Sequence, residues 1–103
     1  MKKYEVRTVS VETKRGKNAL ETYINSTNQD STLVKSFDTP EEAREFYATV
    51  DTSVRYMSGY YLHECKFIEI ANYDDDGEWI DGGDWLERDF PKYNKEADDE
   101  STL

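Results

Sequence analysis

Residues 60–80, YYLHECKFIEIANYDDDGEWI, decide the fold because they combine a long β-prone run with a tight turn and a return. Apolar side chains stand at even positions, such as Leu62 and Ile68, and at odd positions, such as Cys65 and Phe67. Successive side chains of a strand point to opposite faces of the sheet. The run therefore predicts a central strand covered on both faces, and a β-bulge that switches faces mid-strand is the alternative.

An acidic turn at residues 74–77 follows this strand, and its Asp-Gly pair lies between Tyr73 and Trp79. Asp-Gly flanked by apolar residues is a strong hairpin signal, because glycine accepts the positive φ that such turns require. We expect a short return strand that pairs near residues 68–70 and ends at residues 81–83.

The first third of the chain predicts three more strands. Residues 4–13 are rich in Val and Thr, with apolar positions that change parity, so we expect a strand with a bulge at residues 7–8. Residues 14–18 suit a hairpin connection, and a second strand is expected at residues 19–26. Residues 32–37 form a shorter, less apolar segment, which suits an edge strand.

Residues 40–50 give the clearest helix pattern in the chain. Thr39 suits the N-cap, Pro40 the first helical position and Glu42 the third, which is a capping box. The helical spacing i, i+3, i+4, i+7 places four apolar side chains on one face: Ala43, Phe46, Tyr47 and Val50. A helix that continues to Ser58 is the alternative.

This order of elements predicts an α+β fold, an antiparallel sheet of about five strands with one helix packed on one face. Residues 1–90 are expected to form a single domain. Residues 91–103 are expected to form an acidic, polar C-terminal tail, because few of their side chains are apolar.

The charge of the chain is unevenly distributed. The 103 residues include 23 acidic and 13 basic side chains, which gives a formal net charge of −10. Residues 1–71 contain 11 acidic and 10 basic residues, whereas residues 72–103 contain 12 acidic and 3 basic residues. Such asymmetry favours an acidic interaction surface or a solvated tail. The basic residues Lys14, Arg15 and Lys17 are too few for phosphate neutralisation, so direct nucleic-acid binding is not expected.

Composition excludes several other classes of protein. No apolar run approaches the about 18 residues of a membrane span, and the N-terminal residues lack the apolar core of a secretory signal. The single cysteine excludes an internal disulfide. We therefore expect a cytoplasmic protein with no membrane partner.

Catalytic and metal-binding patterns are weak. His63 and Cys65 share a strand face, but a Cys-His nucleophile needs hydrogen-bond reach and an orienting third group, and most lone cysteines in strands are core residues. Residues 72–77 match the start of a calcium loop, but Gly83 stands where a bidentate Glu is required. We expect no enzyme activity, no catalytic or metal-ligating residues and no cofactor.

The sequence favours a non-enzymatic interaction protein that presents an acidic surface to a basic protein partner, in a manner that mimics nucleic acid. Trp79 and Trp85 are the expected aromatic anchors. Eight carboxylates form the expected acidic face: Asp74, Asp75, Asp76, Glu78, Asp81, Asp84, Glu87 and Asp89. The alternatives are a homodimer paired through a sheet edge and a small-molecule-binding module with an aromatic pocket.

The segments KKYEVR, FDTPEEAREFY and YDDDGEW resemble small α+β proteins of bacterial mobile elements and phage-like regions. The resemblance covers roughly residues 1–90 and rests on a cap, a helix face and a turn. It implies a bacterial, accessory, cytoplasmic protein, and it carries over no functional residues.

Overall fold

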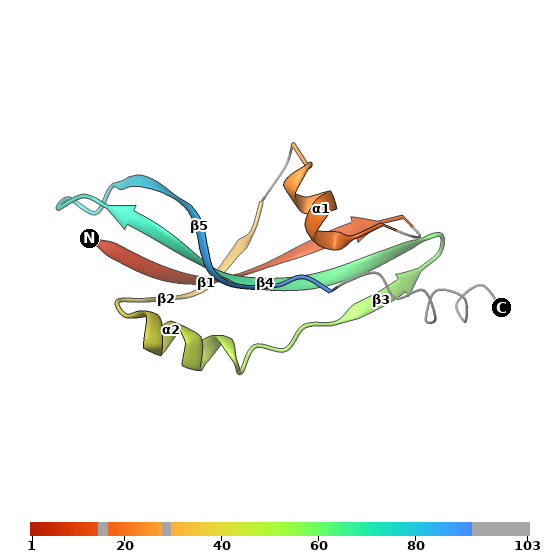
Figure 1. Cartoon of the computed structure of the whole chain (residues 1–103), viewed down its shortest axis with the longest axis horizontal. Coiled ribbons are helices and arrows are strands. Elements are labelled where there is room, and N and C mark those ends of the chain that lie inside the picture. The colour runs from red at the N-terminus through yellow and green to blue at the C-terminus, as the bar shows by residue number, and fades with distance from the viewer. Residues whose placement is uncertain (15–16, 28–29, 92–103) are drawn as a thin grey trace.

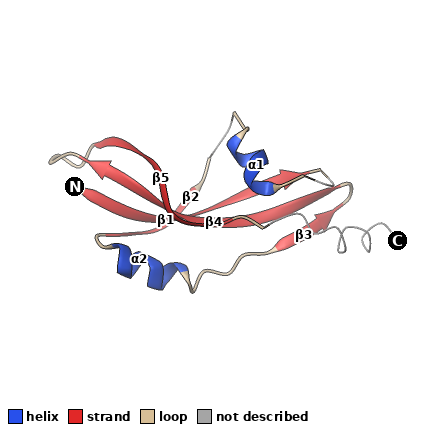
Figure 2. Ribbon diagram, in the orientation of Figure 1, coloured by secondary structure: helices blue, strands red, loops and turns tan. Residues whose placement is uncertain are grey.

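The computed structural model describes residues 1–14, 17–27 and 30–91. The expected hairpin tip at residues 15–16 and the C-terminal tail from residue 92 lie outside the described residues. Figures 1 and 2 show a strongly curled antiparallel sheet with a short helix on either side. The elements in chain order are β1 Lys2–Thr13, α1 Ala19–Ile24, β2 Thr32–Phe37, α2 Pro40–Tyr47, β3 Val54–Met57, β4 Tyr60–Tyr73 and β5 Trp79–Asp89.

Strand β4 is the centre of the sheet, as predicted. The strand order is β2-β1-β4-β3, and β5 also pairs with β4. β1 runs along one edge of β4, whereas β3 pairs with residues 60–63 and β5 with residues 66–73 of β4. β2 pairs with β1 and has the register shift between Val6 and Arg7, beside the bulge expected at residues 7–8. The predicted α+β class with about five strands is thus confirmed, with a second helix added.

Each face of the sheet carries its own apolar cluster, because both parities of β1 and β4 are apolar. Val6 lies opposite Ile68, and both pack with Ala43 of α2; this is the α2 face. On the other face, the α1 face, Val11 and Cys65 pack with two buried residues of α1, Ala19 and Tyr23. Apolar residues therefore occur at both even and odd positions of β4 because both faces of the strand are covered, and not because a bulge switches its faces.

The prediction of a strand at residues 19–26 is wrong, because this segment forms α1. Asn18 caps the helix, and its side-chain oxygen accepts hydrogen bonds from the backbone N–H of Leu20 at 2.9 Å and of Glu21 at 3.4 Å. Alternation of Leu, Thr and Ile suggested a strand, but the buried pair is Ala19 and Tyr23, at the i, i+4 spacing of a helix. Asn18 has φ −90° and ψ 131°, the extended conformation typical of an N-cap.

Helix α2 begins where the capping box predicts. The Thr39 hydroxyl accepts the Glu42 backbone N–H at 3.3 Å and donates to the Glu42 carboxylate at 3.0 Å. The helix ends at Tyr47 and not at residue 50, and Lys66 Nζ donates to the carbonyls of Tyr47 and Val50, each at 2.9 Å. The alternative of a helix continuing to residue 58 is wrong, because β3 occupies that segment.

The turn between β4 and β5 is confirmed, but the return strand differs from the prediction. Gly77 has φ +83°, and Asp74 Oδ1 accepts the backbone N–H of Asp76 and of Glu78, each at 2.9 Å. Strand β5 has 11 residues and begins opposite Tyr73, not near residues 68–70. It does not end at residues 81–83, because the glycines there lie within the strand, at a register shift.

Candidate functional site

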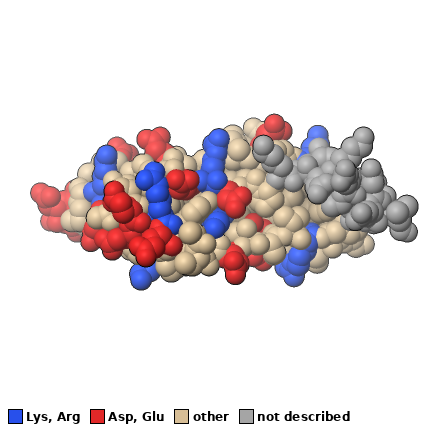
Figure 3. Space-filling view, turned by 60° about the horizontal axis from the view of Figure 1, so that its bottom comes forward, with Lys and Arg blue, Asp and Glu red and all other residues tan. Residues whose placement is uncertain are grey.

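The eight predicted carboxylates all lie on the turn and strand of one hairpin, which we call the acidic hairpin. Its members are Asp74, Asp75, Asp76, Glu78, Asp81, Asp84, Glu87 and Asp89. Most of them are exposed, and Asp74 and Glu87 are half-buried. In Figure 3, acidic side chains gather at the end of the molecule that carries this turn and α2. Helix α2 adds Glu41, Glu42 and Glu45, which the sequence analysis did not assign to the acidic surface.

Register shifts in β5 bring four of these carboxylates to one face. Asp81, Asp84, Glu87 and Asp89 do not follow a simple two-residue period, so a regular strand would divide them between both faces. In the structure they lie opposite alternate residues of β4: Asn72, Ile70, Ile68 and Lys66. The shifts between Ile70 and Asn72 and between Ile68 and Glu69 produce this alignment. The result is a row of four carboxylates on the α2 face of the sheet.

Two contacts fix the row in place. Arg44 Nε of α2 pairs with Glu87 Oε1 at 3.0 Å, which confirms that Glu87 points to the α2 face. The Asn72 amide donates to Asp81 Oδ1 across the strands. Among the described residues, Glu87 is the one member of the acidic hairpin that takes part in an ion pair.

The two predicted aromatic anchors have different environments. Trp79 is 59% exposed and its neighbour Ile80 is 57% exposed, so both present large apolar surfaces beside the acidic turn. Trp85 instead packs against Phe67 and Phe90, with ring centroids 5.6 and 5.7 Å away. The structure thus brings Trp79 to the surface and places Trp85 in the aromatic cluster of the α1 face.

A charged cluster that the sequence analysis missed lies on the α1 face behind the acidic hairpin. The Glu5 side chain is 5% exposed, and its Oε1 accepts from Arg7 Nε at 3.3 Å and Nη2 at 3.2 Å. Its Oε2 accepts from the Tyr73 hydroxyl at 2.7 Å. Glu69 lies directly opposite Glu5, and its Oε2 is 3.8 Å from Arg7 Nε. Only the register of β1 on β4 brings these groups together, so no local pattern predicts them.

Burial and like charge both act on Glu69. Burial raises the pKa of the Glu69 carboxyl; Arg7 lowers it, Glu5 raises it, and a hydrogen bond from the Gly83 backbone N–H lowers it. The hydrogen bond from Tyr73 to Glu5 raises the pKa of the Tyr73 phenol. The guanidinium of Arg7 therefore forms ion pairs with two partly buried carboxylates, those of Glu5 and Glu69.

His63 and Cys65 have core environments. Cys65 is fully buried, and burial raises the pKa of its thiol to about 12, which disfavours the nucleophilic thiolate. His63 is 3% exposed, with Nε2 at 2.9 Å from the Thr13 hydroxyl oxygen and no partner for Nδ1. Burial lowers the pKa of the His63 imidazole. The pair fills the α1 face beside Val11.

Acid is expected to destabilise the protein through His63. The unfolded chain takes up a proton near pH 6.5, whereas the folded chain takes it up only at a lower pH, so the free energy of unfolding falls as pH falls below about 6.5. The fall ends once the folded imidazole also binds a proton. Urea denaturation between about pH 7.5 and 5.5 measures the slope. His63 is the single histidine, so His63→Gln should remove the slope, and an unchanged slope would contradict this assignment.

The residues 72–77 that match the start of a calcium loop form the end of β4 and the turn between β4 and β5. Asp74 Oδ1 accepts two backbone N–H groups, as a turn-capping aspartate does. Within the described ranges, no group of three or more His, Cys, Asp or Glu side chains is arranged to hold a metal ion.

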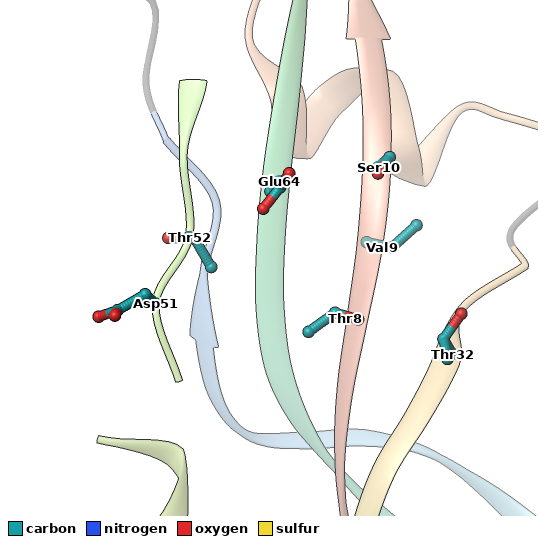
Figure 4. Close-up of a pocket in the computed structure, with 7 residues that line it drawn as sticks. All are labelled: Thr8, Val9, Ser10, Thr32, Asp51, Thr52 and Glu64. Carbon is teal, nitrogen blue, oxygen red and sulfur yellow. The ribbon is translucent and has the colours of Figure 1, made fainter. Parts of the chain in front are cut away.

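A small polar pocket of about 150 Å³ lies on the α2 face, away from the acidic hairpin. Figure 4 shows residues from β1, β2 and β4 and from the segment before β3 around it. In that view Asp51 points away from the pocket, and Val9 points to the other side of the sheet. Its lining is mostly hydroxyl and carboxylate groups, unlike the aromatic lining expected for the small-molecule alternative.

Among the described residues, no helix has the length and apolar character needed to cross a membrane. Comparison of the chain with protein-family models, with curated proteins and with solved structures gave no match.

Proposed function

We propose that the protein is a non-enzymatic interaction protein whose acidic hairpin engages a basic protein partner. The observation that carries this proposal is the alignment of four carboxylates of β5 on one face by two register shifts. Bulges are features that re-aim side chains at functional places, and here they collect like charges that a regular strand would separate.

Charged and apolar side chains of such a surface have different effects on binding: the charges affect the rate of association, and the apolar side chains supply most of the binding energy. A row of negative charges raises the local negative potential and speeds the encounter with a cationic surface. Binding energy comes mainly from buried aromatic and apolar contacts, for which exposed Trp79 and Ile80 are available. A regular row of negative charges is also what a phosphate-binding surface recognises, so we propose that the partner's basic patch otherwise binds nucleic acid.

The test compares the wild type with a variant carrying Asn at five positions of the acidic hairpin: Asp74, Asp75, Asp76, Asp81 and Asp84. Each protein is used to capture partners from a bacterial lysate, which the resemblance to mobile-element proteins supports as the source. The captured protein is identified, purified and bound again over a range of salt concentrations. We expect a basic protein, released by rising salt and bound at least about tenfold more weakly by the variant.

A matched control changes the same charge elsewhere. Substitution of Glu12, Glu21, Asp30, Asp51 and Glu64 by their amides also removes five negative charges, but leaves the acidic hairpin intact. This control should bind the partner nearly as well as the wild type. Equal weakening of both variants would reduce the effect to net charge, and no weakening in either would exclude the acidic hairpin as the interface.

Self-association through β2 is the second candidate. Within the described part of the chain, β2 pairs with β1 alone, and it exposes Leu33 and Val34 at 45% and 44%. The segment TLVKSF has no acidic residue, so two copies meet less charge repulsion there than at β5. Light scattering of the wild type separates the candidates, because a second copy doubles the molar mass without any basic partner.

A further inference from the structure

The Glu69 carboxylate lies beside the exposed indole of Trp79 on the α1 face of the acidic hairpin. Trp79 is opposite Tyr73, which shares a parity with Glu69 on β4, so both side chains belong to that face. Gly82 lies between them. A Cβ at Gly82 would be 3.1 Å from Glu69 Oε1 and 3.3 Å from Trp79 Nε1, so the glycine permits the close approach of both groups.

The charges around Glu69 do not balance. Arg7 directs Nε and Nη2 to Glu5, and its Nη1 donates to the Ser31 hydroxyl at 3.1 Å and carbonyl at 3.3 Å. Its distance to Glu69 is 3.8 Å, beyond a hydrogen bond. Two carboxylates thus share one guanidinium, whose hydrogen bonds go to Glu5 and Ser31, so its ion pair with Glu69 is the looser of the two.

Glu69 is also within reach of a ligand. Its side chain is 24% exposed, whereas that of Glu5 is 5% exposed. Burial, the largest effect, raises the pKa of the Glu69 carboxyl, Arg7 and the Gly83 backbone N–H lower it, and Glu5 raises it. A cation that reaches the exposed part of this carboxylate acts in the same direction as Arg7 and stabilises the ionised form.

We propose that Glu69 and Trp79 bind an arginine side chain of the basic partner, with the guanidinium stacked on the indole and hydrogen-bonded to the carboxylate. The identity of the ligand as a partner side chain rests on the proposed function. A planar guanidinium fits the pair formed by Glu69 and Trp79, because it stacks on aromatic faces and pairs with carboxylates through two donors. The carboxylate row on the α2 face and this site on the α1 face then contact the partner from both sides of β5.

The test uses a single cation, so that it does not depend on the row of carboxylates. N-acetyl-arginine amide is titrated into ¹⁵N-labelled protein at low salt, and the indole N–H signal of Trp79, assigned with Trp79→Phe, is followed. We expect a saturable shift that is abolished by Glu69→Gln and retained in Glu64→Gln, which removes a carboxylate of the same strand on the α2 face, outside the acidic hairpin. N-acetyl-citrulline amide, which is neutral, should cause no shift, and N-acetyl-lysine amide should bind at least about threefold more weakly.

Each outcome separates this inference from the proposed function. Equal binding by the wild type and Glu69→Gln, or equal binding of the arginine and citrulline amides, overturns the Glu69–Trp79 site. If Glu69→Gln retains the affinity of the wild type for the basic partner, the site is also overturned while the acidic hairpin remains the interface. If arginine amide binds through Glu69 but no basic protein is captured, the site stands and the proposed function fails.

Discussion

Substitution of Phe67 by alanine should lower the free energy of unfolding by about 3–5 kcal/mol, the cost of truncating a buried aromatic side chain. Phe67 is 1% exposed at the middle of β4. Its ring lies 5.6 Å from Trp85, 6.2 Å from Tyr23 and 6.2 Å from Phe90, measured between centroids. These neighbours come from α1, from β5 and from the residue that follows β5. The truncation therefore leaves a cavity where three segments meet.

The loss is large against the about 5–15 kcal/mol of a typical domain, so the variant should unfold at a clearly lower urea concentration. Tryptophan fluorescence reports the transition, because Trp85 belongs to the same cluster. Phe67→Leu keeps most of the apolar volume and should cost less than the alanine variant. A loss below about 1 kcal/mol for Phe67→Ala would mean that the cluster closes over the cavity, contrary to the packing described.

Sequence patterns predicted those elements whose signals are local. The central strand, its two apolar faces, the turn at Gly77 and the start of α2 each depend on residues within a few positions of one another. Asp74 and Thr39 make the hydrogen bonds that their positions predict. Such contacts join residues that are close in sequence, so a single sequence can indicate them.

Two of the errors in the fold, those at α1 and at β5, have a common physical cause. Residues 19–24 alternate in polarity like a strand, but their partner is the α1 face of the sheet, and burial of Ala19 and Tyr23 selects the helix. Strand β5 passes through two glycines that usually mark a turn, because β4 offers it a free edge to pair with. In both segments tertiary packing overrides the local preference.

The candidate site divides in the same way. The eight carboxylates and Trp79 could be chosen from the sequence, because they are close together in the chain around one acidic turn. Their alignment could not, because it depends on register shifts between β4 and β5. The cluster around Arg7 could not be predicted from the sequence either, because Glu5 and Tyr73 are 68 residues apart in the chain. The uneven distribution of charge along the sequence pointed to the acidic hairpin, whereas the sharing of Arg7 between Glu5 and Glu69 appears only after β1 pairs with β4.

Arg7→Met should destabilise the protein by about 3–5 kcal/mol, because it leaves Glu5 as a buried charge without its cation. Glu5 is 4% exposed and is hydrogen-bonded to Arg7 and Tyr73. The Arg7 side chain is 23% exposed, so water screens part of the interaction and the lower end of that range is expected. Methionine keeps much of the apolar stem, so the loss reports charge and hydrogen bonding more than packing.

The double variant Glu5→Gln/Arg7→Met tests that explanation. Removal of both charges removes the penalty of the isolated carboxylate, so the double variant should be more stable than Arg7→Met alone. Urea denaturation of the wild type, the two single variants and the double variant gives the coupling free energy of the pair. If the double variant loses the sum of the two single losses, Glu5 and Arg7 are not coupled, and the loss in Arg7→Met must come from Ser31 and the packing of the arginine stem. A strong coupling would instead establish that the Arg7 guanidinium compensates the buried carboxylate of Glu5.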